Sequence, residues 1–315
     1  SYFVFLSGAI TIMSKYDELI AQAKTAYQKH ELATAIAFYE EAFQEKIIVE
    51  DLVDLGFVYL DDKNPFKAVA ILEEATAFAF DYPLGFYGLG MAYEEVGRRD
   101  DAIKAYQKVI ELDEAFVNAY FNLALIYDDL EDENQAYNYY KKTLLYAPGH
   151  FWANLNIGSF YEKHDFLDLA LEHTLRAYRK NDQEKMISYN LGVIYAKMKK
   201  YEEAIKYYQE ELKKPKPYIL AYSNLGLLYK DVYQDYKKAQ YYYLEGISQD
   251  KNNSILWYNL ACLYVVMNDF ENAYNCFLYA NLKDKSIFKY MENDEELDMF
   301  RQTETYQKLK QNLKG

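Results

Sequence analysis

Residues that interrupt or cross-link a fold are scarce in this chain. Of its 315 residues, five are proline, 12 are glycine and two are cysteine, which leaves little room for flexible linkers. Cys262 and Cys276 form no CxxC pair and are too few for a disulfide framework, so we expect a reducing compartment, the cytoplasm. No apolar run approaches the roughly 18 residues that span a bilayer, so no membrane partner is expected.

Basic residues are scarce relative to acidic ones. The chain has 35 Lys and Arg against 49 Asp and Glu, a net charge of −14. This balance disfavours nucleic acid and anionic membranes as partners. The acidic excess lies in the first half, because residues 1–150 hold 12 basic against 26 acidic residues whereas residues 151–315 hold 23 of each.

The first twelve residues are apolar but lack the basic region of a secretory signal. Met13, followed by Ser14 and Lys15, is typical of a natural start. We therefore expect residues 1–15 to be a lead segment that is non-native or flexible.

What the chain has in abundance is internal repetition. A leucine or isoleucine, a small residue directly after it and a tyrosine three residues further recur at intervals of 34 residues, with one interval of 35. The small residue and the tyrosine of the seven copies are Gly56 and Tyr59, Gly90 and Tyr93, Ala124 and Tyr127, Gly158 and Tyr161, Gly192 and Tyr195, Gly226 and Tyr229, and Ala261 and Tyr264. Such a period indicates stacked supersecondary units rather than one central core.

Each unit has the apolar spacing of two helices. In one unit, Leu89, Gly90 and Tyr93 share a helical face, a break follows at residues 97–100, and a second periodic stretch covers residues 102–109. The pattern predicts at least sixteen helices in antiparallel pairs and no sheet. Short turns are expected at Gly97–Asp100, Asp132–Glu133 and Lys199–Lys200, and the small residues of each pair, including Gly192 and Ala204, should be buried.

These units resemble the tetratricopeptide repeat family. Its 34-residue motif has an aromatic residue at position 4, Leu-Gly at 7 and 8, Tyr at 11, Ala at 20, an aromatic residue at 24, Ala at 27 and Pro at 32. The fourth unit matches through Tyr120, Leu123, Ala124, Tyr127, Ala136, Tyr140 and Pro148. The resemblance covers roughly residues 16–285 as eight repeats, the first of them degenerate. It implies an all-α, right-handed α-α superhelix (solenoid) and a non-enzymatic scaffold for protein binding.

The remaining segments depart from the motif. Residues 286–315 lack it and resemble the family's C-terminal capping segment, through the run from Asn293 to Leu297 and Phe300. The sixth repeat has Glu211 at position 27, where a small apolar residue is usual, and Pro215 and Pro217 follow. We therefore expect a looser junction between the sixth and seventh repeats.

An asparagine ladder is the strongest candidate for a binding site. In this family the first helix of each repeat lines a concave groove, and position 6 on that helix is asparagine in five successive repeats: Asn122, Asn156, Asn190, Asn224 and Asn259. A side-chain amide both donates and accepts hydrogen bonds, so a row of amides can pair with the backbone of an extended peptide. The alternative is that asparagine is simply common at position 6 in this family and binds no ligand here.

Apolar side chains flank the expected ladder. Groove positions 2, 5 and 9 include Met91, Phe121, Leu125, Trp152, Tyr189, Val193, Leu227 and Tyr258. Water-facing helix positions are usually polar, so an apolar groove indicates either a partner that buries it or cover by neighbouring first helices. The carboxylate clamp of chaperone-binding relatives is not expected, because position 9 is never asparagine here.

Signals for catalysis are weak, and no cofactor is expected. The spacings of the four histidines, His30, His150, His164 and His173, fit no usual metal site. No glycine-rich phosphate loop and no GxSxG motif occurs.

Four functions remain open at this stage. The first is a protein-interaction scaffold that holds an extended protein or peptide segment in its groove. The others are a peptide-sensing regulator, the substrate-recruiting arm of an enzyme complex, and a structural protein that self-associates into a homo-oligomer.

Overall fold

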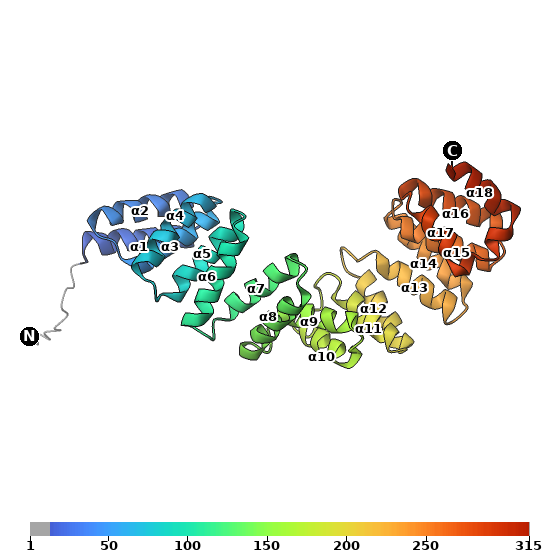
Figure 1. The fold of residues 1–315 in the computed structure, drawn as a ribbon, viewed down its shortest axis with the longest axis horizontal. Coiled ribbons are helices and arrows are strands. Elements are labelled where there is room, and N and C mark those ends of the chain that lie inside the picture. Colours follow the sequence, from blue (N-terminus) through green and yellow to red (C-terminus); the bar gives the residue numbers. More distant parts are fainter. Residues whose placement is uncertain (1–12, 315) are drawn as a thin grey trace, which may run out of the picture. The chain divides into compact units, whose positions relative to one another are not determined.

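The computed structural model describes residues 13–314. Within this range the chain forms eighteen α-helices and two short 3-10 helices, and no strand (Figure 1). The α-helices are α1 (Lys15–Gln28), α2 (Leu32–Glu45), α3 (Val49–Asp61), α4 (Pro65–Phe78), α5 (Pro83–Glu95), α6 (Arg99–Leu112), α7 (Val117–Asp129), α8 (Glu133–Tyr146), α9 (Phe151–Lys163), α10 (Leu167–Tyr178), α11 (Ile187–Lys197), α12 (Tyr201–Leu212), α13 (Leu220–Asp231), α14 (Tyr236–Gln249), α15 (Ser254–Val266), α16 (Phe270–Lys283), α17 (Ile287–Asn293) and α18 (Glu304–Lys314); the 3-10 helices are η1 (Glu295–Leu297) and η2 (Phe300–Gln302).

The helices pair in sequence order. From α1 with α2 to α15 with α16, each odd-numbered helix packs against the helix that follows it. The predicted all-α fold with at least sixteen helices is therefore confirmed, and α6, α8 and α12 begin at the predicted turns. The chain divides into two compact units, which we call unit 1 (residues 1–148) and unit 2 (residues 149–315). The predicted lead segment falls largely on residues 1–12, outside the described residues.

The turn between the two helices of a repeat has nearly the same backbone geometry each time. One residue there adopts a left-handed conformation, and the next backbone N–H donates to the carbonyl five residues before it, as Arg98 does to Tyr93 at 2.8 Å. The seventh repeat has one extra residue in this turn, so Asp235 donates to the carbonyl six residues back, that of Tyr229, at 2.8 Å. Only one of these left-handed residues is glycine, Gly97; the others are His30, Lys63, Glu131, Asp165, Lys199, Gln234 and Asn268. The turn is therefore held by its hydrogen bonds even where the residue type is unfavourable.

The core of a repeat is a large ring packed against a small residue. Gly192 on α11 and Ala204 on α12 are buried, as predicted. The space that Gly192 leaves is filled by the ring of Tyr208, and a Cβ placed on Gly192 would lie only 2.5 Å from that ring. Gly90 and Gly226 receive Tyr106 and Tyr243 in the same way. In these three repeats the glycine at position 8 allows the ring at position 24 to approach closely, whereas the fourth and eighth repeats place Ala124 and Ala261 opposite Tyr140 and Phe277.

The abundant tyrosines form a second regular set of contacts between paired helices. The rings at positions 11 and 23 stack nearly parallel in three repeats, with centroids 5.4–5.6 Å apart. The stacked pairs are Tyr127 with Tyr139, Tyr195 with Tyr207, and Tyr229 with Tyr242. Other tyrosines join neighbouring repeats through carboxylates, as Tyr93 does by donating to Glu73 at 2.7 Å. Packing and hydrogen bonding therefore account for many of the 36 tyrosines in the chain.

The junction between repeats six and seven contains a buried, hydrogen-bonded carboxylate at the position where the sequence suggests a packing defect. Glu211 is fully buried and is not a packing defect. Its Oε1 accepts the backbone N–H groups of Met186 and Tyr218, each at 3.2 Å, and its Oε2 accepts from Lys214 Nζ at 2.7 Å. This carboxylate ties the segments before α11 and α13 to the end of α12, so Glu211 itself does not loosen the junction.

The C-terminal segment covers the end of the last repeat. Ile287, Met291, Leu297, Phe300 and Tyr306 are buried in one cluster with α15 and α16. The ring of Phe300 stacks on Phe277 with centroids 5.4 Å apart. Since the last pair of a repeat array otherwise exposes an apolar face, this contact is the expected role of a cap.

The tyrosines predict how stability changes at high pH. Burial, and then the hydrogen bond to a carboxylate, raises the pKa of both Tyr27 and Tyr93 to about 12, whereas an unfolded tyrosine titrates near 10. The folded protein holds these protons more tightly, so their stabilisation is complete below about pH 10 and is lost as the pH rises towards about 12.

We therefore expect the urea midpoint to fall steadily between about pH 9 and about pH 12, and to fall less in a Tyr27→Phe/Tyr93→Phe variant. A midpoint that does not change over this range would contradict the assignment.

Candidate functional site

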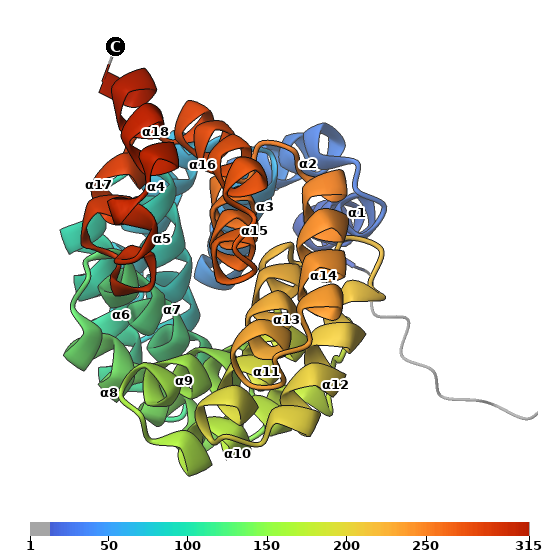
Figure 2. The ribbon, with the colours of Figure 1, turned by 90° about the vertical axis from the view of Figure 1, so that its right-hand side faces the viewer.

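The candidate site is the surface formed by positions 2, 5, 6 and 9 of the first helix of each repeat, which we call the first-helix face. The predicted site residues on this face lie on α5 and α7 in unit 1 and on α9, α11, α13 and α15 in unit 2. In unit 2 the first helices α9 and α11 lie on one side and their partners α10 and α12 on the other (Figure 2). Each unit therefore presents its own first-helix face.

The ladder asparagines are half-buried, and three of them bind hydroxyl groups of the preceding repeat. Asn122 Nδ2 donates to Tyr106 at 3.0 Å and to Tyr87 at 3.4 Å. Asn224 Nδ2 repeats this pattern at 3.1 Å to Tyr208 and 3.3 Å to Tyr189. Asn259 donates instead to Ser223 Oγ at 2.7 Å. In these three asparagines the side-chain N–H groups form hydrogen bonds within the protein, while the amide oxygen can still accept a hydrogen bond from a ligand.

Asn190 is the exception in this row. Among the described side chains, none forms a hydrogen bond with its amide. The reason is the residue at position 24 of the preceding repeat, which is Thr174 and not an aromatic residue. Asn156 is half-buried on α9 like the other rungs.

The expected apolar groove residues lie on the first helices, but they differ in exposure. Trp152 and Leu125 are exposed by 46% and 39%, respectively. Half-buried positions are occupied by Met91, Phe121, Tyr189, Val193 and Leu227. The prediction for Tyr258 is corrected by the structure. This residue is only 6% exposed, and the cap covers it: its hydroxyl donates to Asp294 and its ring packs edge-on against Tyr290. It does not line an open groove.

Two cavities open on the first-helix face of unit 2. One, of about 290 Å³, lies between α11 and α13 and is lined by Val193, Asn224 and Leu227 among others. The other, of about 180 Å³, lies between α9, α10 and α11 and includes Gly158, Thr174 and Asn190. Both contain a ladder asparagine beside apolar side chains, which is the combination typical of a peptide-binding surface.

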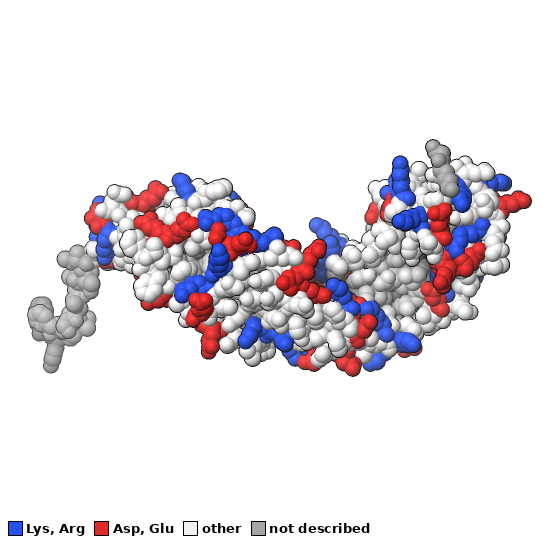
Figure 3. All heavy atoms as spheres, viewed as in Figure 1, with Lys and Arg blue, Asp and Glu red and all other residues white. Residues whose placement is uncertain are grey.

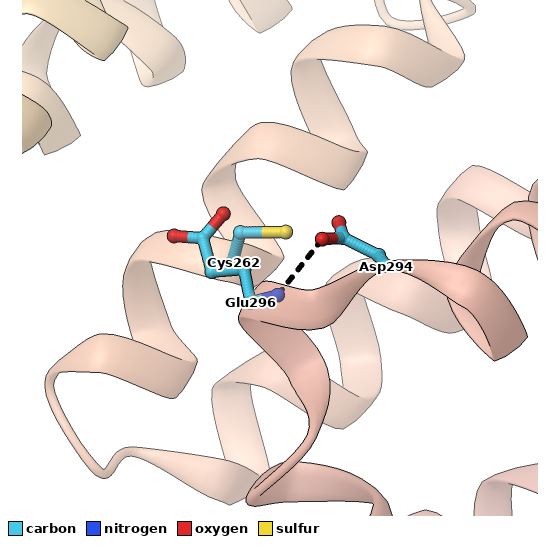
Figure 4. Close-up of side chains that lie close together, drawn as sticks. All are labelled: Cys262, Asp294 and Glu296. Atoms are coloured by element: carbon cyan, nitrogen blue, oxygen red, sulfur yellow. Dashed lines mark hydrogen bonds between the residues drawn. The ribbon is translucent and has the colours of Figure 1, made fainter.

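A cluster of possible metal ligands occurs near the cap. The ligating atoms of Cys262, Asp294 and Glu296 lie within 4.8 Å of one another (Figure 4). Lys230 already forms an ion pair with Glu296, and Tyr258 donates to Asp294. Burial, and then the negative charge of Glu296, raises the pKa of Cys262, which favours the thiol over the thiolate that a metal requires. The cluster is therefore best explained as a polar tie between α13, α15 and the cap.

The histidines of unit 2 hold local structure. His150 Nδ1 accepts the Ala153 N–H at 3.2 Å at the start of α9. His173 lies 2.9 Å from Asn154 Oδ1, and its ring stacks on Tyr161. Burial lowers the pKa of both His150 and His173. These contacts explain the histidines through packing and helix capping.

Charged side chains do not form one continuous patch on the face seen in Figure 3. Acidic and basic side chains are intermixed there, with wide uncharged areas between them. None of the helices described in residues 13–314 combines the length and the apolar character that crossing a bilayer requires.

Comparisons with known proteins agree with this geometry. A family profile described as TPR repeat matches residues 95–130, and profiles described as tetratricopeptide repeat match residues 117–150, 187–210 and 255–282. No curated protein matches the chain.

Several solved structures are similar. A tetratricopeptide repeat protein from Parabacteroides merdae ATCC 43184 is 16% identical, with 78% of this chain and 97% of that chain covered and a TM-score of 0.52. The Pseudomonas aeruginosa protein PilF is 17% identical, with 66% and 94% covered and a TM-score of 0.54. A chain of the APC/C hetero-tetramer Cut9–Hcn1 is 16% identical, with 94% and 55% covered and a TM-score of 0.51. At these identities the likeness concerns the fold alone.

Proposed function

Because the chain is a tetratricopeptide repeat protein, a family of protein-interaction scaffolds, we propose that its first-helix face binds an extended segment of a partner protein. The observation that carries this proposal is the row of asparagines beside two open cavities in unit 2. The amide oxygens would accept peptide N–H groups, and the neighbouring apolar side chains would supply most of the affinity.

The proposed role is non-enzymatic. Among the described residues, His150 and His173 form hydrogen bonds to neighbouring groups and both cysteines are buried, and no nucleophile–base pair is seen there. Both cysteines are buried and free, which supports a cytoplasmic site of action as part of this proposal. A protein or peptide partner remains the proposed ligand class.

The ladder can be tested by a triple variant, Asn156→Ala/Asn190→Ala/Asn224→Ala. Each net hydrogen bond contributes about 0.5–1.5 kcal/mol, so loss of three rungs should weaken peptide binding at least tenfold. The probe is a set of peptides selected on the wild-type protein from a random-sequence display library, and their affinities can be measured by fluorescence anisotropy.

Stability must be measured on the same variant, because Asn224 also binds Tyr208 and Tyr189. Asn190→Ala alone is the cleanest control: its melting temperature should equal that of the wild type, since its amide bonds no described side chain. Unchanged peptide affinity in the triple variant would place the ligand elsewhere.

A further inference from the structure

The fifth repeat lacks the ring that fills its neighbours. In the third, sixth and seventh repeats a tyrosine at position 24 lies against the glycine at position 8. The fifth repeat keeps the glycine, Gly158, but has Thr174 at the position of the ring. A six-membered ring is thus missing from a site whose small facing residue is retained.

In the fifth repeat, α9 and α10 fill only part of the space that the ring would occupy. A Cβ placed on Gly158 would lie 2.4 Å from Thr174 Oγ1 and 3.3 Å from the Thr174 backbone nitrogen, whereas the corresponding neighbours of Gly192 are ring atoms of Tyr208. A cavity of about 180 Å³ nevertheless remains between α9, α10 and α11. A cavity of about 150 Å³ is large enough to hold benzene.

Polar groups lie at both ends of this cavity. Its floor is buried, and Thr174 Oγ1 there has no hydrogen-bond partner within the described chain, at 1% exposure of the residue. Towards the solvent lie the half-buried side chains of Asn190 and Glu162. Lys197 pairs with Glu162 Oε1 at 2.8 Å and keeps this carboxylate in place. A ligand must therefore satisfy a hydroxyl at the floor and an amide and a carboxylate at the mouth.

We propose that this cavity is an anchor pocket for a tyrosine side chain of the bound peptide. The aromatic ring would lie in the cavity beside Gly158 and Val193, and its hydroxyl would bond to Thr174 Oγ1. The peptide unit of the same residue would lie at the mouth, where Asn190 can pair with it and Glu162 can accept its N–H. The inference rests on the proposed function, because the peptide must lie along the first-helix face.

Other side chains fit this pocket less well. An aliphatic or phenylalanine side chain would leave the buried Thr174 hydroxyl unpaired, which is unfavourable. A lysine or arginine would have to compete with Lys197 for Glu162. A tyrosine combines the ring volume with a terminal hydroxyl that both donates and accepts.

The pocket can be tested without knowing the partner. The probes are p-cresol, which is the tyrosine side chain, and toluene, which lacks the hydroxyl, titrated into the full-length protein and followed by NMR. For a fragment of this size we expect a p-cresol dissociation constant on the order of 1 mM, with toluene about tenfold weaker because it leaves the hydroxyl unpaired. Equal binding of the two probes, or no binding of either, would overturn the proposal.

Two variants locate the binding. Thr174→Val removes the hydroxyl without changing the side-chain shape, so it should abolish the preference for p-cresol over toluene while the protein stays folded. Val193→Phe should block the pocket and weaken p-cresol binding at least tenfold. Its control is Leu244→Phe, an exposed leucine of α14 in the same unit that lines neither cavity, which should leave p-cresol binding unchanged. If Val193→Phe had no effect, the probe would bind elsewhere and the assignment would be wrong.

Selected peptides separate this inference from the proposed function. Peptides from the display library should share one tyrosine, and its replacement by phenylalanine should weaken binding about tenfold to the wild type but not to Thr174→Val. Peptides that depend on the asparagine ladder but need no tyrosine would overturn the pocket and leave the first-helix face as the binding site. Peptides insensitive to the ladder variant would overturn the proposed function itself, and p-cresol binding would then decide the pocket alone.

Discussion

Replacing Glu211 by alanine should destabilise the protein by about 3–5 kcal/mol, the range for breaking a buried ion pair by removing one partner. The carboxylate is completely buried and accepts from Lys214 Nζ at 2.7 Å. Its loss would leave the nearly buried Lys214 ammonium with the Glu184 carbonyl, at 2.7 Å, as its one remaining partner among the described residues. It would also leave the N–H groups of Met186 and Tyr218 without this acceptor. Urea unfolding followed by circular dichroism measures the effect.

Two controls accompany this variant. Glu203→Ala removes a carboxylate from the exposed side of the same helix and should change stability by less than about 0.5 kcal/mol. Glu211→Ala/Lys214→Met removes both charges and should recover part of the loss, since no unpaired ammonium remains buried. If Glu211→Ala were as stable as Glu203→Ala, the carboxylate would not hold the junction.

Replacing Gly192 by leucine should cost about 1–3 kcal/mol through overpacking. A Cβ alone would lie 2.5 Å from the ring of Tyr208, which is 2% exposed, so the ring would have to be displaced from its packed position. Displacement of the ring would also break the hydrogen bond from Asn224 to its hydroxyl. The melting temperature and the urea midpoint should both fall.

The compensating change for Gly192→Leu is taken from the chain itself. Tyr208→Thr in the same background copies the threonine that the fifth repeat has at position 24, so the double variant should be more stable than Gly192→Leu alone. Lys206→Leu, on the exposed side of α12, controls for the added leucine and should have little effect. A Gly192→Leu protein with wild-type stability would show that the ring does not require the glycine.

The helices and turns could be predicted because they depend on local spacing. A 34-residue period and the small residues at positions 8 and 20 specify a helix pair without knowledge of the neighbouring repeats. Several of the left-handed turn residues could not be identified in this way. Lys63, Glu131, Lys199 and Gln234 have side chains that do not favour that conformation, unlike Gly97, Asp165 and Asn268. Their geometry follows from the hydrogen bonds that end each first helix.

The rest of the site depends on contacts between residues far apart in the sequence. Glu211 departs from the motif, but its partners Met186 and Tyr218 belong to other segments, so the motif could only suggest a defect. The burial of Tyr258 depends on how the cap folds back on α15. The cavity near Thr174 was visible in the sequence only as a missing aromatic residue at position 24. That this missing ring leaves a cavity could be recognised only from the packing of the corresponding ring in the other repeats.

The central claim is that the first-helix face holds an extended peptide. Hydrogen–deuterium exchange of the full chain, with and without a library-selected peptide, tests it directly. We predict that the peptide slows exchange in α9, α11 and α13, which carry Asn156, Asn190 and Asn224, and leaves their partners α10, α12 and α14 nearly unchanged. Protection confined to the second helices or to the cap would contradict the account.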